Sequence, residues 1–71
     1  MDERRRAISD YFNKLDEARK KEPTLRHYCK KTLEANIIKI YKGDDVIIKV
    51  EEEDEATAYR QAQSRLESLM R

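Results

Sequence analysis

The sequence predicts one small α+β domain of order α-α-β-β-α, in which three helices pack on one face of a two-stranded antiparallel hairpin. Two observations lead to this fold class. Apolar residues recur at three- and four-residue steps near both ends of the chain, which is typical of amphipathic helices. Between them, two β-branched runs flank Gly43-Asp44, a two-residue loop that favours a hairpin. The 71 residues suffice for a single domain, residues 1–71, and no more.

The first predicted helix runs from Asp2 to Lys21. Its apolar stripe consists of Ile8, Tyr11, Phe12, Leu15 and Ala18. Asp2 suits the N-cap, and the lysines at the end of the segment suit the negative end of the helix dipole. The helix is expected to end before Pro23, because the residue that precedes a proline is disfavoured in the helical region.

The segment from Thr24 to Asn36 is predicted to form a second helix. Its apolar residues follow helical spacing and are Leu25, Tyr28, Cys29 and Leu33. Pro23 suits a first helical position. The alternative is a strand over Thr24–Lys31, which would place His27 and Cys29 on one side together with Leu25. The helix is favoured because TLEAN, the turn that the strand would need, contains no Gly, Pro or Asp.

Ile37–Lys42 and Asp45–Glu51 are predicted strands. Gly43, the only glycine, stands where a positive φ is needed. Alternation places one set on the core face, namely Ile38, Ile40, Val46, Ile48 and Val50. It places another set on the opposite face, namely Ile37, Lys39, Tyr41, Ile47, Lys49 and Glu51. Because both edges and the second face of such a hairpin are open, homodimerisation through the hairpin is a hypothesis.

The last helix is predicted from Glu53 or Asp54 to Arg71, with acids at its positive end. Helices and hairpin together predict a core. It consists of Ile8, Tyr11, Phe12, Leu15, Leu25, Cys29, Leu33, Ile38, Ile40, Val46, Ile48, Val50, Ala62, Leu66 and Leu69.

Composition narrows the class of protein. Charged residues make up 44% and the net charge is only +1. One cysteine excludes an internal disulfide. No apolar run is long enough to span a membrane, and the N-terminus lacks a stretch of signal-peptide type. We therefore expect a soluble protein with no membrane partner, cytoplasmic if it is made in a cell, although the sequence does not name a compartment.

The sequence predicts no catalytic residue, no metal site and no cofactor, and hence no enzyme. In a helix, His27 and Cys29 would point about 200° apart. In the alternative strand they would share a face about 7 Å apart, and a thiol–imidazole pair would remain open. A single glycine cannot form a phosphate-cradling loop. The acidic run Glu51–Glu55 lacks the ligand spacing of a calcium loop.

A basic cluster around Pro23 predicts an alternative function, nucleic-acid binding through a basic helix face. Its residues are Arg19, Lys20, Lys21, Arg26, Lys30 and Lys31. Tyr28 is expected to face inward rather than to stack on bases. A protein-interaction module that uses the second face of the hairpin is a further alternative.

Two resemblances follow from these motifs. With the strand alternative, the order α-β-β-β-α resembles double-stranded-RNA-binding domains, with DEATAYRQAQSRLESL at the place of their last helix. That family has a Lys-Lys start to this helix, whereas this chain has Asp54-Glu55, so the resemblance implies the fold rather than RNA binding.

The whole chain also resembles a computationally designed (de novo or redesigned) small α/β protein. KGDD forms the hairpin turn, VIIKVEEEDEATA reads as strand, loop and acid-capped helix, and the single Gly and Pro stand only at breaks. This resemblance implies a structural scaffold with no evolved biological activity, and that is the function expected from the sequence.

Overall fold

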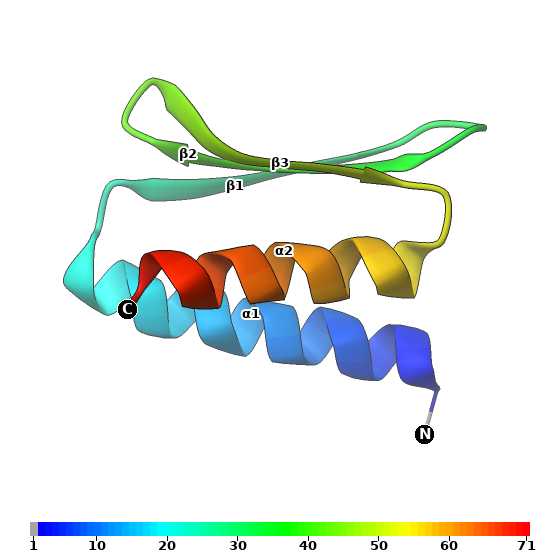
Figure 1. The fold of residues 1–71 in the computed structure, drawn as a ribbon, viewed down its shortest axis with the longest axis horizontal. Helices are drawn as coiled ribbons and strands as arrows, with labels where there is room; N and C mark the ends of the chain where they lie inside the picture. The colour runs from blue at the N-terminus through cyan, green and yellow to red at the C-terminus, as the bar shows by residue number, and fades with distance from the viewer. Residues whose placement is uncertain (1) are drawn as a thin grey trace.

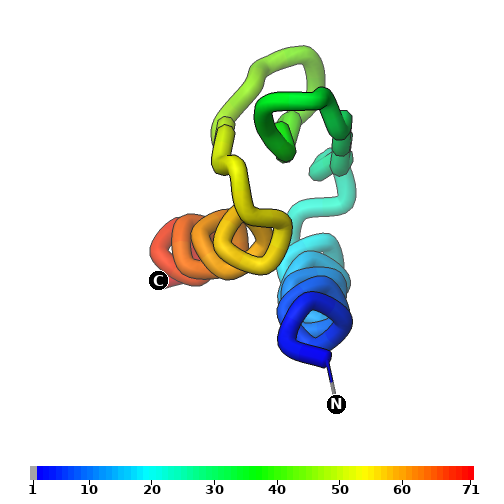
Figure 2. Tube along the Cα trace, turned by 90° about the vertical axis from the view of Figure 1, so that its right-hand side faces the viewer, coloured from blue at the N-terminus to red at the C-terminus, as the bar shows by residue number. Residues whose placement is uncertain are grey.

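The computed structural model describes residues 2–71 and has the order α-β-β-β-α. Its elements are α1 (Glu3–Lys21), β1 (Leu25–Lys31), β2 (Asn36–Lys42), β3 (Asp45–Glu52) and α2 (Glu55–Leu69). The strands form one antiparallel sheet in the order β1-β2-β3. Both helices lie side by side under the same face of that sheet (Figures 1 and 2). The prediction of three helices on a two-stranded hairpin is therefore wrong.

The segment after Pro23 is the origin of this error, because it forms a strand and not a helix. β1 pairs with β2 along its whole length, from Leu25 opposite Lys42 to Lys31 opposite Asn36. β2 would otherwise be an edge strand with unpaired backbone groups, and β1 satisfies them. The pairing also places Leu25 in the core, at 5% exposure. Pro23 lies in the turn between α1 and β1, and not at a helix start.

The turn between β1 and β2 is built around Thr32 rather than around Gly or Pro. The Thr32 hydroxyl accepts hydrogen bonds from the backbone N–H groups of Glu34 (3.2 Å) and Ala35 (2.9 Å). The Thr32 backbone N–H donates to the Ala35 carbonyl over 2.9 Å. Such a side chain mimics a backbone turn. Leu33 stands at the tip and is fully exposed, so its predicted place in the core is wrong.

The hairpin of β2 and β3 is confirmed, with Gly43 at a φ of 63°. Its predicted alternation is interrupted by a bulge, because Ile40 pairs with Ile48 whereas Tyr41 pairs with Val46. Ile47 is the extra residue. Val46 consequently turns to the outside and is 47% exposed, although it was predicted in the core. Ile47, predicted on the opposite face, lines a groove together with Leu66, Leu69 and Met70 of the α2 segment.

Both helix starts are capped by an aspartate. Asp2 accepts a hydrogen bond from the Arg4 backbone N–H over 3.0 Å, which confirms the predicted start of α1. Asp54 accepts from the Thr57 backbone N–H over 2.8 Å and begins α2. Arg60 of α2 ties the helices together through Asp10 (2.7 Å) and Glu3 (3.0 Å) of α1.

The core fills the layer between sheet and helices. It consists of Ala7, Tyr11, Leu15, Ala18, Leu25, Ile38, Ile40, Ile48, Val50, Ala58, Tyr59, Ala62 and Leu66. Phe12 and Leu69 are 37% and 56% exposed, so their predicted place in the core is wrong. Cys29, also predicted in the core, is exposed on β1, an edge strand of the sheet. Ile8 packs at the margin of the core.

Candidate nucleic-acid interface

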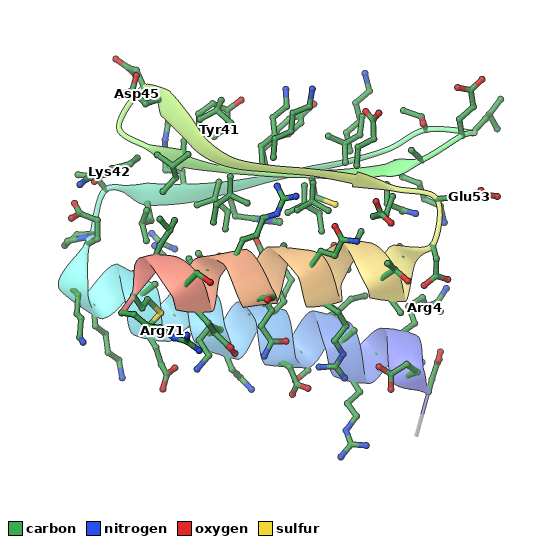
Figure 3. All side chains as sticks on the ribbon, viewed as in Figure 1. Arg4, Tyr41, Lys42, Asp45, Glu53 and Arg71 are labelled. Carbon is green, nitrogen blue, oxygen red and sulfur yellow. The ribbon has the colours of Figure 1, made fainter. Side chains whose placement is uncertain are left out.

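One face of the sheet carries no helix and is open to solvent (Figure 1). We call it the outer face. Alternate residues of the three strands project from it, and cross-strand partners form three rows. The rows are Arg26–Tyr41–Val46, Tyr28–Lys39–Lys49 and Lys30–Ile37–Glu51. Tyr41 is labelled on this side in Figure 3, where many nitrogen-tipped side chains also rise from the sheet.

The outer face has a surplus of positive charge. Four cations stand on it, Arg26, Lys30, Lys39 and Lys49, against one acid, Glu51. The surplus of this face is therefore +3, although the net charge of the whole chain is only +1. Lys39 and Lys49 are direct cross-strand partners, and like charges placed so are destabilising.

None of these four cations takes part in an ion pair within residues 2–71. The ion pairs of that range join the helices to each other or lie within α1 and its cap, apart from Lys42 with Glu22 beside the β2–β3 turn. On the helix side, Arg4, Lys14 and Arg60 pair with carboxylates, whereas the cations in the last turn of α1, Arg19, Lys20 and Lys21, form no ion pair in residues 2–71. What distinguishes the four cations of the outer face is that they lie together on one uncovered surface.

Two tyrosine rings lie among these cations. Tyr28 is 44% exposed, and the Lys39 ammonium lies 5.8 Å from its ring centroid. The Arg26 guanidinium lies 5.7 Å from the Tyr41 centroid and donates to the Gly43 carbonyl over 3.2 Å. Cation–π contacts hold each ring beside a positive charge. The prediction that Tyr28 faces inward is wrong, because in a strand it points away from Leu25 and Cys29.

The structure divides the basic cluster that was predicted from the sequence. Arg19, Lys20 and Lys21 lie in the last turn of α1, whereas Arg26 and Lys30 project from the outer face of β1. Lys31 neighbours Lys30 along the strand and therefore points to the other side. Sequence reasoning left Lys39, Lys49 and Tyr41 out of the candidate site. Their shared face was already visible in the alternation of the two hairpin strands.

The start of α2 offers no second anion site. Asp54 caps the helix, and the hydrogen bond from the Thr57 backbone N–H lowers the pKa of its carboxyl group. Glu55 in the first turn pairs with Arg4 over 3.4 Å. The positive end of the helix dipole is thus already occupied by carboxylates of the chain itself.

On the helix side of β1, His27 and Cys29 point in the same direction, so the prediction that they diverge is wrong. The Tyr11 hydroxyl lies 2.8 Å from His27 Nδ1. Cys29 Sγ lies 3.3 Å from the Tyr59 hydroxyl. Burial raises the pKa of both tyrosines and lowers the pKa of His27, so all three are neutral near pH 7. The Tyr11 hydroxyl and His27 Nδ1 therefore share a hydrogen bond between two neutral groups.

Each of the two reactive side chains of β1 is thus bonded to a different tyrosine. No hydrogen bond in residues 2–71 joins the thiol to the imidazole, although such a bond is the usual signature of an activated cysteine. Phe12 packs edge-on to the His27 ring, with centroids 5.0 Å apart, and completes this group. These contacts between side chains of β1 and aromatic residues of α1 and α2 hold the edge strand against the helices.

Two further properties of residues 2–71 bear on function. No group of three or more His, Cys, Asp or Glu side chains in that range is placed to hold a metal ion. Neither α1 nor α2 has the length and apolarity that crossing a membrane requires. Comparisons of the chain with protein-family models, with curated proteins and with solved structures give no match.

Proposed function

We propose that the outer face binds single-stranded nucleic acid. The observation that carries this proposal is the set of four cations without ion-pair partners around two tyrosines on an uncovered sheet. Aromatic rings on which bases stack, together with cations that follow the phosphates, are the recurring parts of single-strand binding surfaces. A polyanion would also relieve the repulsion between Lys39 and Lys49.

The two rings supply neighbouring stacking positions. Tyr28 and Tyr41 are diagonal neighbours on adjacent strands, a relation that separates side chains by about 7–8 Å. Tyr28 is the more open platform. Arg26 is held by the Gly43 carbonyl and by the Tyr41 ring, and its remaining N–H groups could bind a phosphate. Bases stacked inside a duplex cannot reach either ring, which favours a single strand.

The test is a titration of labelled single-stranded RNA, single-stranded DNA and duplex, followed by fluorescence anisotropy at about 50 mM and about 200 mM salt. Single strands should bind more tightly than duplex, and affinity should fall steeply with salt. Tyr28→Ala should cost about 1–3 kcal/mol of binding free energy, whereas Tyr28→Phe keeps the ring and should bind nearly as the parent does.

Variants that remove a single charge distinguish binding at the outer face from nonspecific electrostatic attraction of nucleic acid to the protein. Lys39→Ala should lower the slope of log affinity against log salt by about 0.7. Lys20→Ala removes an equal charge at the end of α1 and is the matched control, with an unchanged slope. Equal effects of the two variants, or tighter binding of duplex than of single strands, would contradict the proposal.

The competing proposal is a structural scaffold without a ligand, as the resemblance to designed proteins implies. It is supported by the regularity of the chain. Within residues 2–71 every buried side-chain polar atom has a hydrogen-bond partner, and Gly43 alone has a positive φ. Working sites usually break such rules somewhere. Absence of binding to any single strand even at the lower salt concentration would favour the scaffold.

A further inference from the structure

The two edges of the sheet differ. On β3, the Arg65 guanidinium of α2 donates to the Lys49 backbone carbonyl over 2.7 Å. The bulge at Ile47 lies on the same strand. Bulges and covering side chains are the usual ways in which proteins close a sheet edge. The β3 edge is therefore closed near its middle.

The backbone of β1 has a free edge at its centre. Gly43 N–H donates to the Thr24 carbonyl, and Thr32 N–H donates to the Ala35 carbonyl, so the residues at both ends of the strand bond toward β2. Hydrogen-bonded and non-bonded positions alternate in an antiparallel pair. The N–H and C=O groups of His27 and Cys29 consequently point away from the sheet. No other group in residues 2–71 bonds to them.

The side chains around this edge are of two kinds. β1 contains no acid; its cations Arg26 and Lys30 project from the outer face, and Lys31 stands at the end of the strand on the helix side. Below the edge, facing α1, Phe12 is 37% exposed and Cys29 is also exposed, so apolar surface is uncovered there. A strand laid along β1 would place alternate side chains over these two environments, one charged and one apolar.

We propose that the edge of β1 docks an extended segment of a partner protein, in which acidic and apolar residues alternate, as a fourth strand of the sheet. Its backbone pairs with His27 and Cys29. Its acidic residues lie on the outer side beside Arg26 and Lys30, and its apolar residues cover Phe12. Main-chain bonds supply affinity and the alternating side chains supply specificity in this mode of recognition.

Charge favours an acidic partner over a second copy of the chain. If two β1 strands paired antiparallel about Tyr28, Arg26 of each copy would stand opposite Lys30 of the other. Like charges placed directly across a strand pair are destabilising. An acidic strand would instead place a carboxylate opposite Arg26 and another opposite Lys30, so the repulsion would become attraction.

The test uses a peptide as long as β1 in which glutamate and valine alternate, blocked at both ends. NMR hydrogen exchange of the free protein should show fast exchange at the His27 and Cys29 amides. Saturating peptide should slow exchange at these two amides, while exchange at Lys49 and Glu51 on the β3 edge stays as before. Unchanged exchange at His27 and Cys29 would overturn the proposal.

Two N-methylated peptides sharpen the test, because a methyl group on an edge N–H removes one bond without changing charge. Methylation at alternate residues in one register faces β1 and should abolish binding. The same number of methyl groups in the other register faces solvent and should leave binding intact. Equal loss in both registers would show that no strand is added.

Protein variants test whether attraction between the cations of β1 and the glutamates of the peptide contributes to binding. Lys30→Glu should weaken the glutamate–valine peptide roughly five- to tenfold, and Lys20→Glu, at the end of α1, should not. A lysine–valine peptide should bind more weakly than the glutamate–valine peptide. If His27 and Cys29 become protected without peptide as protein concentration rises, and sedimentation shows a dimer, the edge belongs to a second copy and the proposal is overturned.

Discussion

At the scale of single residues, the bond between Tyr11 and His27 links α1 to the edge strand. Tyr11→Phe removes the hydroxyl and leaves the half-buried His27 Nδ1 without its hydrogen-bond partner. The free energy of unfolding should fall by about 1 kcal/mol, the usual net worth of such a bond. Urea unfolding measures it. Tyr41→Phe removes a hydroxyl from the solvent side of the sheet and is the control, with a change near zero.

His27 also makes stability depend on pH. Burial lowers its pKa in the folded state below the usual 6.5, so the unfolded chain takes up the proton first as pH falls. The contribution of neutral His27 is therefore complete above about pH 6.5 and is lost as pH falls through the lower folded-state pKa. Tyr11 and Tyr59, which lie on the neighbouring helices, stay neutral throughout this window.

Unfolding free energies measured between about pH 7.5 and about pH 5 should fall toward the acid end. In His27→Gln, which keeps a hydrogen-bonding side chain but cannot titrate, the fall should be smaller. Parallel pH profiles for the parent and the variant would contradict the assignment and would place the titrating group elsewhere.

At the scale of elements, the sequence predicted α1, both hairpin strands and α2, and failed at β1. Leu25 and Cys29 are four residues apart. Residues at that spacing share a face in a helix, and they also share a face in a strand, where every second residue points the same way. His27 between them is polar and concealed the alternation, because its partner, the Tyr11 hydroxyl, comes from another element. The turn was also concealed, since the Thr32 side chain replaces the expected glycine. Tertiary pairing with β2 then decided the structure.

The β2–β3 turn requires the left-handed conformation at Gly43, whose φ is 63°. No atom lies within 4 Å of the position that a Cβ would take at this residue, so the cost of a side chain there is conformational rather than steric crowding. Gly43→Val should lower the unfolding free energy by about 1–2 kcal/mol. Gly43→Asn should cost less, because asparagine tolerates this region. Thermal unfolding of both variants checks the order, and equal losses would contradict it.

At the scale of the whole molecule, the position of β1 determines which leucines matter. Leu66 of α2 is 1% exposed, whereas Leu33 at the β1–β2 turn is fully exposed. Leu66→Ala should cost about 2–5 kcal/mol of unfolding free energy. Leu33→Ala should stay within about 0.5 kcal/mol. Denaturant unfolding distinguishes the pair, and a large loss for Leu33→Ala would restore the helical interpretation of residues 24–36.

The candidate interface was only partly predictable from the sequence, because β1 was not predicted as a strand of the sheet. The sequence placed Lys39, Tyr41 and Lys49 on one face of the hairpin, but nothing local placed Arg26 and Tyr28 beside them. That neighbourhood exists only through the register of β1 on β2. Of the six basic residues that the sequence groups around Pro23, only Arg26 and Lys30 belong to the cluster that spans the three strands.

Arg65, which covers the β3 edge of the sheet, also affects whether molecules of this protein can polymerise. Subunits with two unlike complementary sides can join head to tail without limit, whereas subunits with one such side cannot. β1 is basic and the end of β3 is acidic, so the two margins attract each other once both are accessible. Arg65→Ala removes one of the two features that close the β3 edge, so we expect it to form fibres more readily than the parent protein, which thioflavin fluorescence and light scattering would measure. Arg71→Ala, an equal loss of charge, should leave the solution clear.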